Sequence, residues 1–235
     1  MMSHEFSLSA EYKRKAIHIG SSGFALLLRW LSFWQAALLA VAALLFNLFV
    51  LPRIGGKKLY RQEDAARGYP IGILLYPVSV LLLILFFHNH LYIAAAAWAI
   101  MAWGDGFASV FGRKFGKRKL PWNSDRSYAG SIAFLILGGA AAVFFTCWVW
   151  KDPLTPMLWY VVLVPLLTTL LAAIVETIPS GLNDNFTVPL SAGLFMAALY
   201  QIDPAMLEIA KTGLLQPQDL GCGGALKTAC GNHLL

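Results

Sequence analysis

The sequence is short of charge and of cysteine. Only 13% of its 235 residues are charged, roughly half the share of an ordinary soluble domain. Its three cysteines, Cys147, Cys222 and Cys230, are too few for a disulfide framework and fit no standard zinc spacing. The scarcity of charge excludes an ordinary soluble enzyme, and the scarcity of cysteine excludes a disulfide-stapled secreted domain.

The balance of charge limits the class of partner. Lysine and arginine exceed aspartate and glutamate by 18 to 12, which gives a formal net charge of +6. The cations lie in loops between apolar runs, so they indicate contact with anionic lipid head groups and not a nucleic-acid partner. We expect no cleavable signal peptide, because the first apolar run has no small-residue cleavage site and a second run follows at once.

Long apolar runs dominate what is present. Hydrophobic residues make up 58% of the chain, and apolar runs recur along nearly all of it. We predict an all-α, polytopic transmembrane helix bundle with about seven crossings: one integral membrane catalytic domain over 1–202, then a weakly ordered tail over 203–235. The predicted crossings are Ile17–Leu31, Phe33–Leu51, Ile71–Phe87, Leu91–Trp103, Ser131–Trp150, Met157–Val175 and Phe186–Tyr200.

The distribution of lysine and arginine predicts which side of the membrane each loop occupies. Cations gather before the first crossing and in the loops over 52–70 and 104–129, whereas the alternate connections have almost none. Basic loops stay on the cytoplasmic side. Seven crossings with a cytoplasmic N-terminus satisfy this pattern and also put the polar loop over 176–185 on the cytoplasmic face.

The stretch from Met101 to Gly139 has the most unusual composition. An apolar run ends at Asp105, which lies between two glycines, and a basic loop leads to the next apolar run at Ser131. A carboxylate, clustered cations and flexible glycines together suit an anionic ligand with a divalent metal, such as a nucleotide triphosphate. The positive-inside rule alone also accounts for the cations, so both explanations stay open. These cations are Arg113, Lys114, Lys117, Arg118, Lys119 and Arg126.

Four ionisable residues far apart in the sequence are predicted to approach one cytoplasm-facing site. His18 shares a helical face with Lys15, and a polar stripe that enters a membrane helix should face the bundle interior. Asp105, Glu176 and Asp184 lie in connections that the topology puts on the same side of the membrane. His18 is equally well explained as an interfacial histidine without a role.

Three stretches of the chain share their pattern with a known enzyme group. They cover residues 14–20, 104–131 and 176–190, and the most specific is the polar-to-apolar string from Asn183 to Leu190. With these motifs the chain resembles the phytol kinases, dolichol kinases and CTP-dependent diacylglycerol kinases, which are related to the phosphatidate cytidylyltransferases. The likeness extends from about residue 11 to residue 200.

The resemblance implies phosphoryl transfer from CTP, or another nucleotide triphosphate, to a lipid alcohol. The acceptor is expected to be an isoprenoid alcohol such as phytol or dolichol, or diacylglycerol. Asp105 and Asp184 are expected to hold Mg²⁺ or another divalent cation, and His18 or Glu176 to accept the hydroxyl proton. The residues expected to bind the nucleotide are Arg113, Lys114, Lys117, Lys119, Arg126, Ser131, Asn183 and Asn185.

The sequence departs from this group at one position of the central motif. Many members have Glu where Ala129 stands, so no catalytic role is assigned there. Two alternatives stay open: cytidylyltransferase-type nucleotidyl transfer to a phospholipid acid, and a non-enzymatic membrane transporter or interaction protein. The ionisable residues lie at helix ends on one side and not at the bilayer midplane, which favours an interfacial enzyme over a transporter. We expect the protein in a bacterial cytoplasmic membrane.

Overall fold

The computed structural model describes residues 2–54, 71–151 and 159–201, with side chains from Tyr12 onward. Residues Met1–Leu199 form one compact unit, to which everything below refers. Most of the predicted 52–70 loop and the whole predicted tail over 203–235 lie outside the described residues. The predicted domain division at residue 202 therefore stays a prediction.

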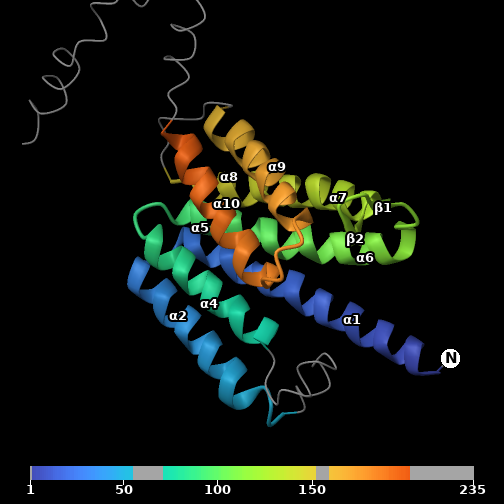
Figure 1. The fold of residues 1–235 in the computed structure, drawn as a ribbon. Helices are drawn as coiled ribbons and strands as arrows, with labels where there is room; N and C mark the ends of the chain where they lie inside the picture. Colours follow the sequence, from blue (N-terminus) through green and yellow to red (C-terminus); the bar gives the residue numbers. More distant parts are fainter. Residues whose placement is uncertain (1, 55–70, 152–158, 202–235) are drawn as a thin grey trace, which may run out of the picture. The chain divides into compact units, whose positions relative to one another are not determined.

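The described chain is mostly helical, as predicted (Figure 1). Its α-helices are α1 (Met2–Ser21), α2 (Phe33–Leu45), α4 (Ile71–Phe86), α5 (Leu91–Ala99), α6 (Gly106–Phe115), α7 (Tyr128–Ala133), α8 (Gly139–Val149), α9 (Val164–Thr177) and α10 (Asp184–Tyr200). A 3₁₀ segment, η1 (Ser22–Arg29), continues α1, and π segments adjoin other helices: η2 (Phe46–Val50), η4 (Ile100–Asp105), η5 (Phe134–Gly138) and η6 (Trp159–Leu163). The all-α prediction missed a short antiparallel hairpin, β1 (Lys119–Leu120) and β2 (Asn123–Ser127).

Four helical segments of the described chain are long and apolar enough, by length and composition, to cross a membrane. They are Phe33–Val50, Leu91–Phe115, Tyr128–Val149 and Trp159–Thr177, and Ile71–Phe86 is apolar but shorter. The four agree with the second, fourth, fifth and sixth predicted crossings. The count of seven crossings is not confirmed, and the side of the membrane on which the N-terminus lies stays a prediction.

The segment Leu91–Phe115 forms the centre of the unit and positions Asp105. The sequence predicts a helix end near Trp103, but the helix continues through η4 and α6. Asp105 therefore lies inside a helix, and the prediction that it follows a helix end is wrong. Tertiary packing here overrides the low helix propensity of the glycines on either side of Asp105.

Small residues allow the surrounding helices to approach this centre closely. Ala95, Ala99 and Ala102 of the central segment are fully buried. A Cβ added to Gly138 would lie 3.1 Å from the Cα of Gly104 on the neighbouring segment. Such close backbone approach is the usual reason for small residues between membrane helices.

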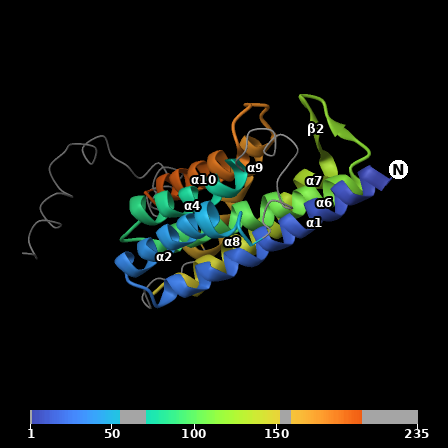
Figure 2. The same ribbon diagram turned by 90° about the horizontal axis from the view of Figure 1, so that it is seen from below.

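Helix α1 contacts η4 and α6 of the central segment, and Figure 2 shows it running along α6. A Cβ on Gly106 would lie 2.6 Å from Cγ1 of Ile19, so the two helices are in close contact. The hairpin lies at the same end of the unit as the start of α1 (Figure 2). The polar face of α1 is thus brought to Asp105.

Candidate active site

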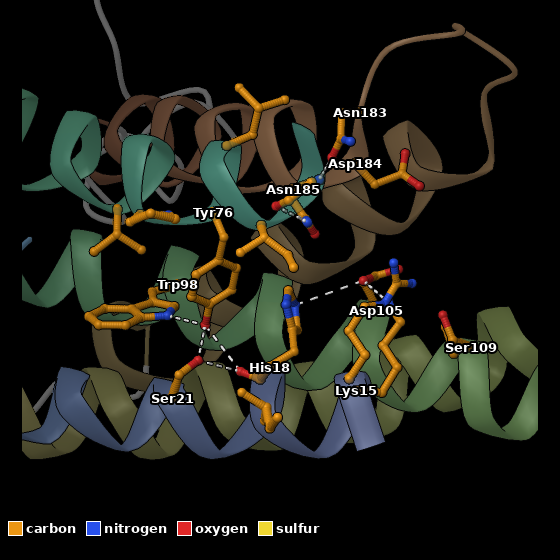
Figure 3. A pocket seen from close by; sticks show the side chains of 18 of the residues that line it. Lys15, His18, Ser21, Tyr76, Trp98, Asp105, Ser109, Asn183, Asp184 and Asn185 are labelled. Carbon is orange, nitrogen blue, oxygen red and sulfur yellow. Dashed lines mark hydrogen bonds and ion pairs between the residues drawn. The ribbon is translucent and has the colours of Figure 1, made fainter. Parts of the chain in front are cut away.

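A buried ion pair joins α1 to the central helix. Lys15 Nζ donates to Oδ2 of Asp105, and the two residues are only 5% and 4% exposed. His18, one turn further along α1, has its Nε2 atom 3.9 Å from the same oxygen. Figure 3 shows Lys15 and His18 rising from α1 toward Asp105.

The His18 ring leaves one polar atom unused. Within the described ranges, its buried Nε2 has no hydrogen-bond partner. Buried polar groups are nearly always paired in native proteins, so an unpaired one calls for an explanation such as a catalytic role or an absent ligand. His18 also lines the cavity described below.

A second charged cluster is centred on Arg126, just before α7. Its Nη1 lies 2.9 Å from Oε1 of Glu176, at the end of α9, and its Nη2 forms an ion pair with Asp184, at the start of α10. Glu176 is only 2% exposed. Arg126 therefore ties the start of α7 to the ends of two other helices.

The electrostatics of this cluster reflect partial burial. Burial raises the pKa of Asp184, and the Arg126 guanidinium only partly offsets this. Burial also disfavours the charged form of Arg126, but Glu176 and Asp184 more than compensate, so its pKa is raised. Arg126 stays protonated, whereas Asp184 is held less firmly in its charged form than a solvent-exposed aspartate.

The segment that begins α10 is held against α4 by amide contacts. Asn185 Nδ2 donates to the carbonyl oxygen of Gly72 over 2.9 Å, and the Asn185 carbonyl accepts from Ser79 Oγ at 2.7 Å. Asn183 Oδ1 accepts from the Asn185 backbone N–H at 3.0 Å, an Asx turn that starts the helix. These contacts give both asparagines a structural task in addition to their position beside the cavity.

One cavity of about 1600 Å³ connects these groups. At its charged end, five Lys or Arg side chains and four Asp or Glu side chains line it: Arg14, Lys15, Arg113, Lys119 and Arg126 against Asp105, Asp125, Glu176 and Asp184. Away from this end the lining comes from η1, α2 and α4 and is apolar apart from a few uncharged polar groups. The cavity thus offers one continuous space for an amphiphilic molecule.

A polar network forms the wall where the charged end meets the apolar part. The Tyr76 hydroxyl accepts from Trp98 Nε1 at 2.6 Å and donates to the carbonyl oxygen of His18 at 3.1 Å. Ser21 Oγ lies 3.0 Å from the same Tyr76 hydroxyl. The Tyr76 ring also contacts the His18 ring edge-on, with centroids 4.5 Å apart. Figure 3 shows Tyr76 between α4 and α1. Tyr76 thus holds the backbone of His18 by a hydrogen bond and packs against its imidazole ring.

The structure brings most of the predicted site residues to this cavity. Its lining includes His18, Asp105, Arg113, Lys119, Arg126, Ser131, Glu176, Asn183, Asp184 and Asn185. Lys114 and Lys117 are not among the lining residues, and Lys114 lies over the ring of Phe115 instead. Ser131 Oγ is buried and, in the described part of the chain, has no hydrogen-bond partner.

Sequence reasoning left out three contributors to the site. Lys15 was visible as a helical neighbour of His18, and its spacing on the same face was a sufficient signal. Tyr76 and Trp98 lie inside apolar runs, where an aromatic residue is normally read as packing. Only the structure shows that their polar atoms meet beside His18.

Curated proteins similar to this chain include phytol and farnesol kinases of plants. The chain is 31% identical over 192 residues to "Phytol kinase 1, chloroplastic" of Arabidopsis thaliana, which covers 76% of this chain and 63% of that protein. It is 30% identical over 203 residues to "Probable phytol kinase, chloroplastic" of Zea mays, with 80% and 66% covered. It is also 30% identical over 194 residues to "Farnesol kinase, chloroplastic" of Arabidopsis thaliana, with 77% and 63% covered. These matches show a likeness to the phytol/polyprenol kinase family over most of the chain.

This likeness confirms the resemblance to phytol kinases that the sequence motifs indicate. The chain spans slightly less than two thirds of the length of these relatives, from 63% to 66%. No protein-family model matches the chain. No solved structure matches it either. The relatives' names refer to chloroplasts, so they do not support the expectation of a bacterial cytoplasmic membrane.

Proposed function

We propose that this protein is a membrane kinase that phosphorylates an isoprenoid alcohol such as phytol or farnesol. The observation that supports this most directly is the single cavity, charged at one end and apolar along the rest. A lipid alcohol has the same division, with one reactive hydroxyl on a long hydrocarbon tail. The names of the phytol and farnesol kinase relatives point to the same class of acceptor.

The reaction moves one phosphoryl group and one proton. The alcohol oxygen attacks the γ-phosphorus of the donor, the bond from that phosphorus to the bridging oxygen breaks, and the products are the lipid monophosphate and a nucleoside diphosphate. We propose that His18 Nε2 takes the hydroxyl proton, because it is buried beside Asp105 and has no partner among the described residues. Glu176, the other predicted base, is paired with Arg126 and is better suited to hold that cation in place.

Cations of the charged end are proposed to bind the donor's phosphates. Arg113 and Lys119 line the cavity together with Arg126, and Ser131 offers a buried hydroxyl. Lys114 and Lys117 lie near this end in sequence and are proposed to attract the nucleotide without lining the cavity. Positioning and charge neutralisation contribute most to phosphoryl transfer, which requires little covalent chemistry from the protein. CTP is the donor expected from the sequence resemblance.

A divalent cation fits the donor set, since Mg²⁺ is commonly held by one or two carboxylates together with substrate phosphates. Asp105 and Asp184 line the same cavity and are the proposed ligands. Each is paired with a cation, Lys15 or Arg126. Within the described residues, no cluster of three or more His, Cys, Asp or Glu side chains forms a ready metal site. The metal, when bound with the nucleotide, would neutralise phosphate charge.

For the topology we propose seven crossings with the charged end of the cavity in the cytoplasm. The α1–η1 helix, α4 and α10 would supply the three crossings that fall short of the length and composition criteria. This arrangement keeps the basic hairpin and the start of α1 on the cytoplasmic side. It also places the apolar part of the cavity within the hydrocarbon core of the bilayer.

The test is a direct assay with purified protein, Mg²⁺, and CTP or ATP labelled in the γ-phosphate. Phytol, farnesol, dolichol and diacylglycerol are compared as acceptors, and His18→Ala serves as the control variant. We expect labelled lipid monophosphate and unlabelled nucleoside diphosphate from an isoprenoid alcohol. Release of pyrophosphate with a nucleotide-linked lipid from phosphatidic acid, or no turnover of any lipid, would contradict the proposal.

A further inference from the structure

The apolar part of the cavity lies between η1 and α2, and we call it the wedge. The proposed phosphoryl transfer takes place at the other, charged end of the cavity. We propose that this wedge holds the tail of the alcohol and that its closed end, formed by Leu31, Ala36 and Ile84, sets the longest tail accepted. The inference rests on the proposed kinase function and adds the determinant of substrate length.

The wedge exists because the chain reverses sharply between η1 and α2. Ser32 starts α2 with a capping box: its Oγ accepts from the Gln35 backbone N–H, and Gln35 Oε1 accepts from the Ser32 N–H at 2.9 Å. From this turn α2 diverges from η1 and packs against α4, whereas η1 packs against α5 (Figure 1). The two segments therefore meet at the turn and separate toward the charged end.

The walls of the wedge are apolar. Phe24, Leu27, Leu28 and Leu31 line it from the η1 side, Ala36, Leu39, Ala40, Ala43 and Phe46 from the α2 side, and Val80 and Ile84 from α4. No lining residue of η1, α2 or α4 carries a charge, and each of these elements is fully described. A hydrocarbon chain is the occupant that such walls favour, because burying its surface gains roughly 25 cal/mol per Å².

The wedge is continuous with the reacting end and has a definite depth. His18 and Leu31 line opposite ends of the same cavity, and the helical path between them rises on the order of 20 Å, at about 1.5 Å per residue in α1 and about 2.0 Å per residue in the 3₁₀ segment η1. An isoprenoid tail of three or four units, with its hydroxyl at His18, extends over a comparable length. At the far end Ala36 and Ile84 are each only 2% exposed and Leu31 is half-buried, so little of this end is open to solvent.

Ala36 lines the wedge near its closed end, and a larger side chain at this position would shorten the space for the tail. Ala36→Phe fills this end of the wedge, and Leu31→Ala lengthens it. The matched control is Leu38→Phe on the same helix, because Leu38 is 68% exposed and does not line the cavity. All three variants are compared with the wild type for kcat/KM on farnesol, phytol and a longer polyprenol.

We expect Ala36→Phe to reduce kcat/KM for phytol at least tenfold more than for farnesol. Leu31→Ala should raise kcat/KM for the longer polyprenol relative to phytol, and Leu38→Phe should leave all ratios unchanged. A change of equal size for every alcohol in Ala36→Phe and Leu31→Ala would overturn the inference, because it would indicate a structural effect only.

Photolabelling separates this inference from the proposed function. A prenyl alcohol with a diazirine at the tail end should label residues around the turn between η1 and α2, whether or not phosphate is transferred. Labelling there without turnover would support the tail site and contradict the kinase proposal. Two outcomes would contradict the tail site and leave the kinase proposal intact. The first is turnover with labelling only on α9 or α10. The second is turnover with an unlabelled wedge that a helix of a second copy occupies.

Discussion

Asp105 is paired with Lys15, a residue 90 positions earlier in the chain, and both side chains are almost fully buried. The pair fixes α1 against the central helix at the point where the cavity is charged. A buried pair of this kind contributes little net stability while both partners are present, but the loss of one partner leaves an uncompensated charge.

Removal of the Lys15 charge should destabilise the protein. We expect Lys15→Met to cost about 3–5 kcal/mol, because Asp105 would stay buried without its partner. The measurement is thermal or denaturant unfolding in detergent. Lys13→Met on the same helix is the control, since Lys13 is exposed and should change little. Equal stabilities of the two variants would show that the ion pair does not form.

Asp105 and Asp184 should act as a unit if they share the metal. Asp105→Asn and Asp184→Asn should each lower kinase activity by orders of magnitude per folded molecule. Activity is normalised to the folded fraction, because Asp105→Asn also leaves buried Lys15 without its partner. The double variant should be scarcely worse than either single variant, because groups that act together are strongly non-additive. Activities are measured across a range of Mg²⁺ concentrations. Near-normal activity of one variant at any of them would remove that residue from the proposed site.

Close packing at Gly130 should be intolerant of even one methyl group. An added Cβ would lie 2.9 Å from the carbonyl oxygen of Ala108, which is backbone and cannot move alone. We expect Gly130→Ala to destabilise by about 1–3 kcal/mol. Gly20→Ala is the matched control: nothing lies within 4 Å of its Cβ position, so it should stabilise the helix by about 0.5–1 kcal/mol. Unfolding midpoints that change in the same direction would contradict this packing.

Labelling with an impermeant thiol reagent tests the proposed topology. In a background with Cys147, Cys222 and Cys230 replaced by serine, Ser124→Cys in the hairpin should react only from the cytoplasmic side. Asn89→Cys, in the turn between α4 and α5, should react only from the opposite side. Both positions are exposed. Reaction of Ser124→Cys from outside would contradict the placement of the charged end in the cytoplasm.

How much of this could be predicted from the sequence depends on the type of signal. Apolar runs predicted the helices well, because a helix needs apolar side chains whether it is buried in lipid or inside a helix bundle. The helix through Asp105 was not predicted to continue, since local glycine signals indicate an end and only tertiary packing overrides them. The charge distribution predicted that His18, Asp105, Glu176 and Asp184 approach one another, and all four line the same cavity. That they share a cytoplasmic face stays a prediction.

Individual partners in the site were beyond the reach of sequence patterns. That Arg126 binds Glu176 and Asp184 depends on how α7, α9 and α10 meet, and no spacing rule relates those segments. The Tyr76–Trp98 contact likewise joins two apolar helices whose mutual rotation is set by packing. Lys114 and Lys117 were grouped with their basic neighbours by proximity in sequence, although they do not line the cavity.

The π segment that ends at Asp105 makes the site sensitive to chain length as well as to residue type. A π turn accommodates one more residue than an α turn, so the residues that follow it keep the faces that they would have in an α-helix one residue shorter. Converting this segment to a regular α-helix without removing a residue would rotate Asp105 by about 100° relative to α5. All side chains of the site would still be present, yet the carboxylate would face away from Lys15 and His18.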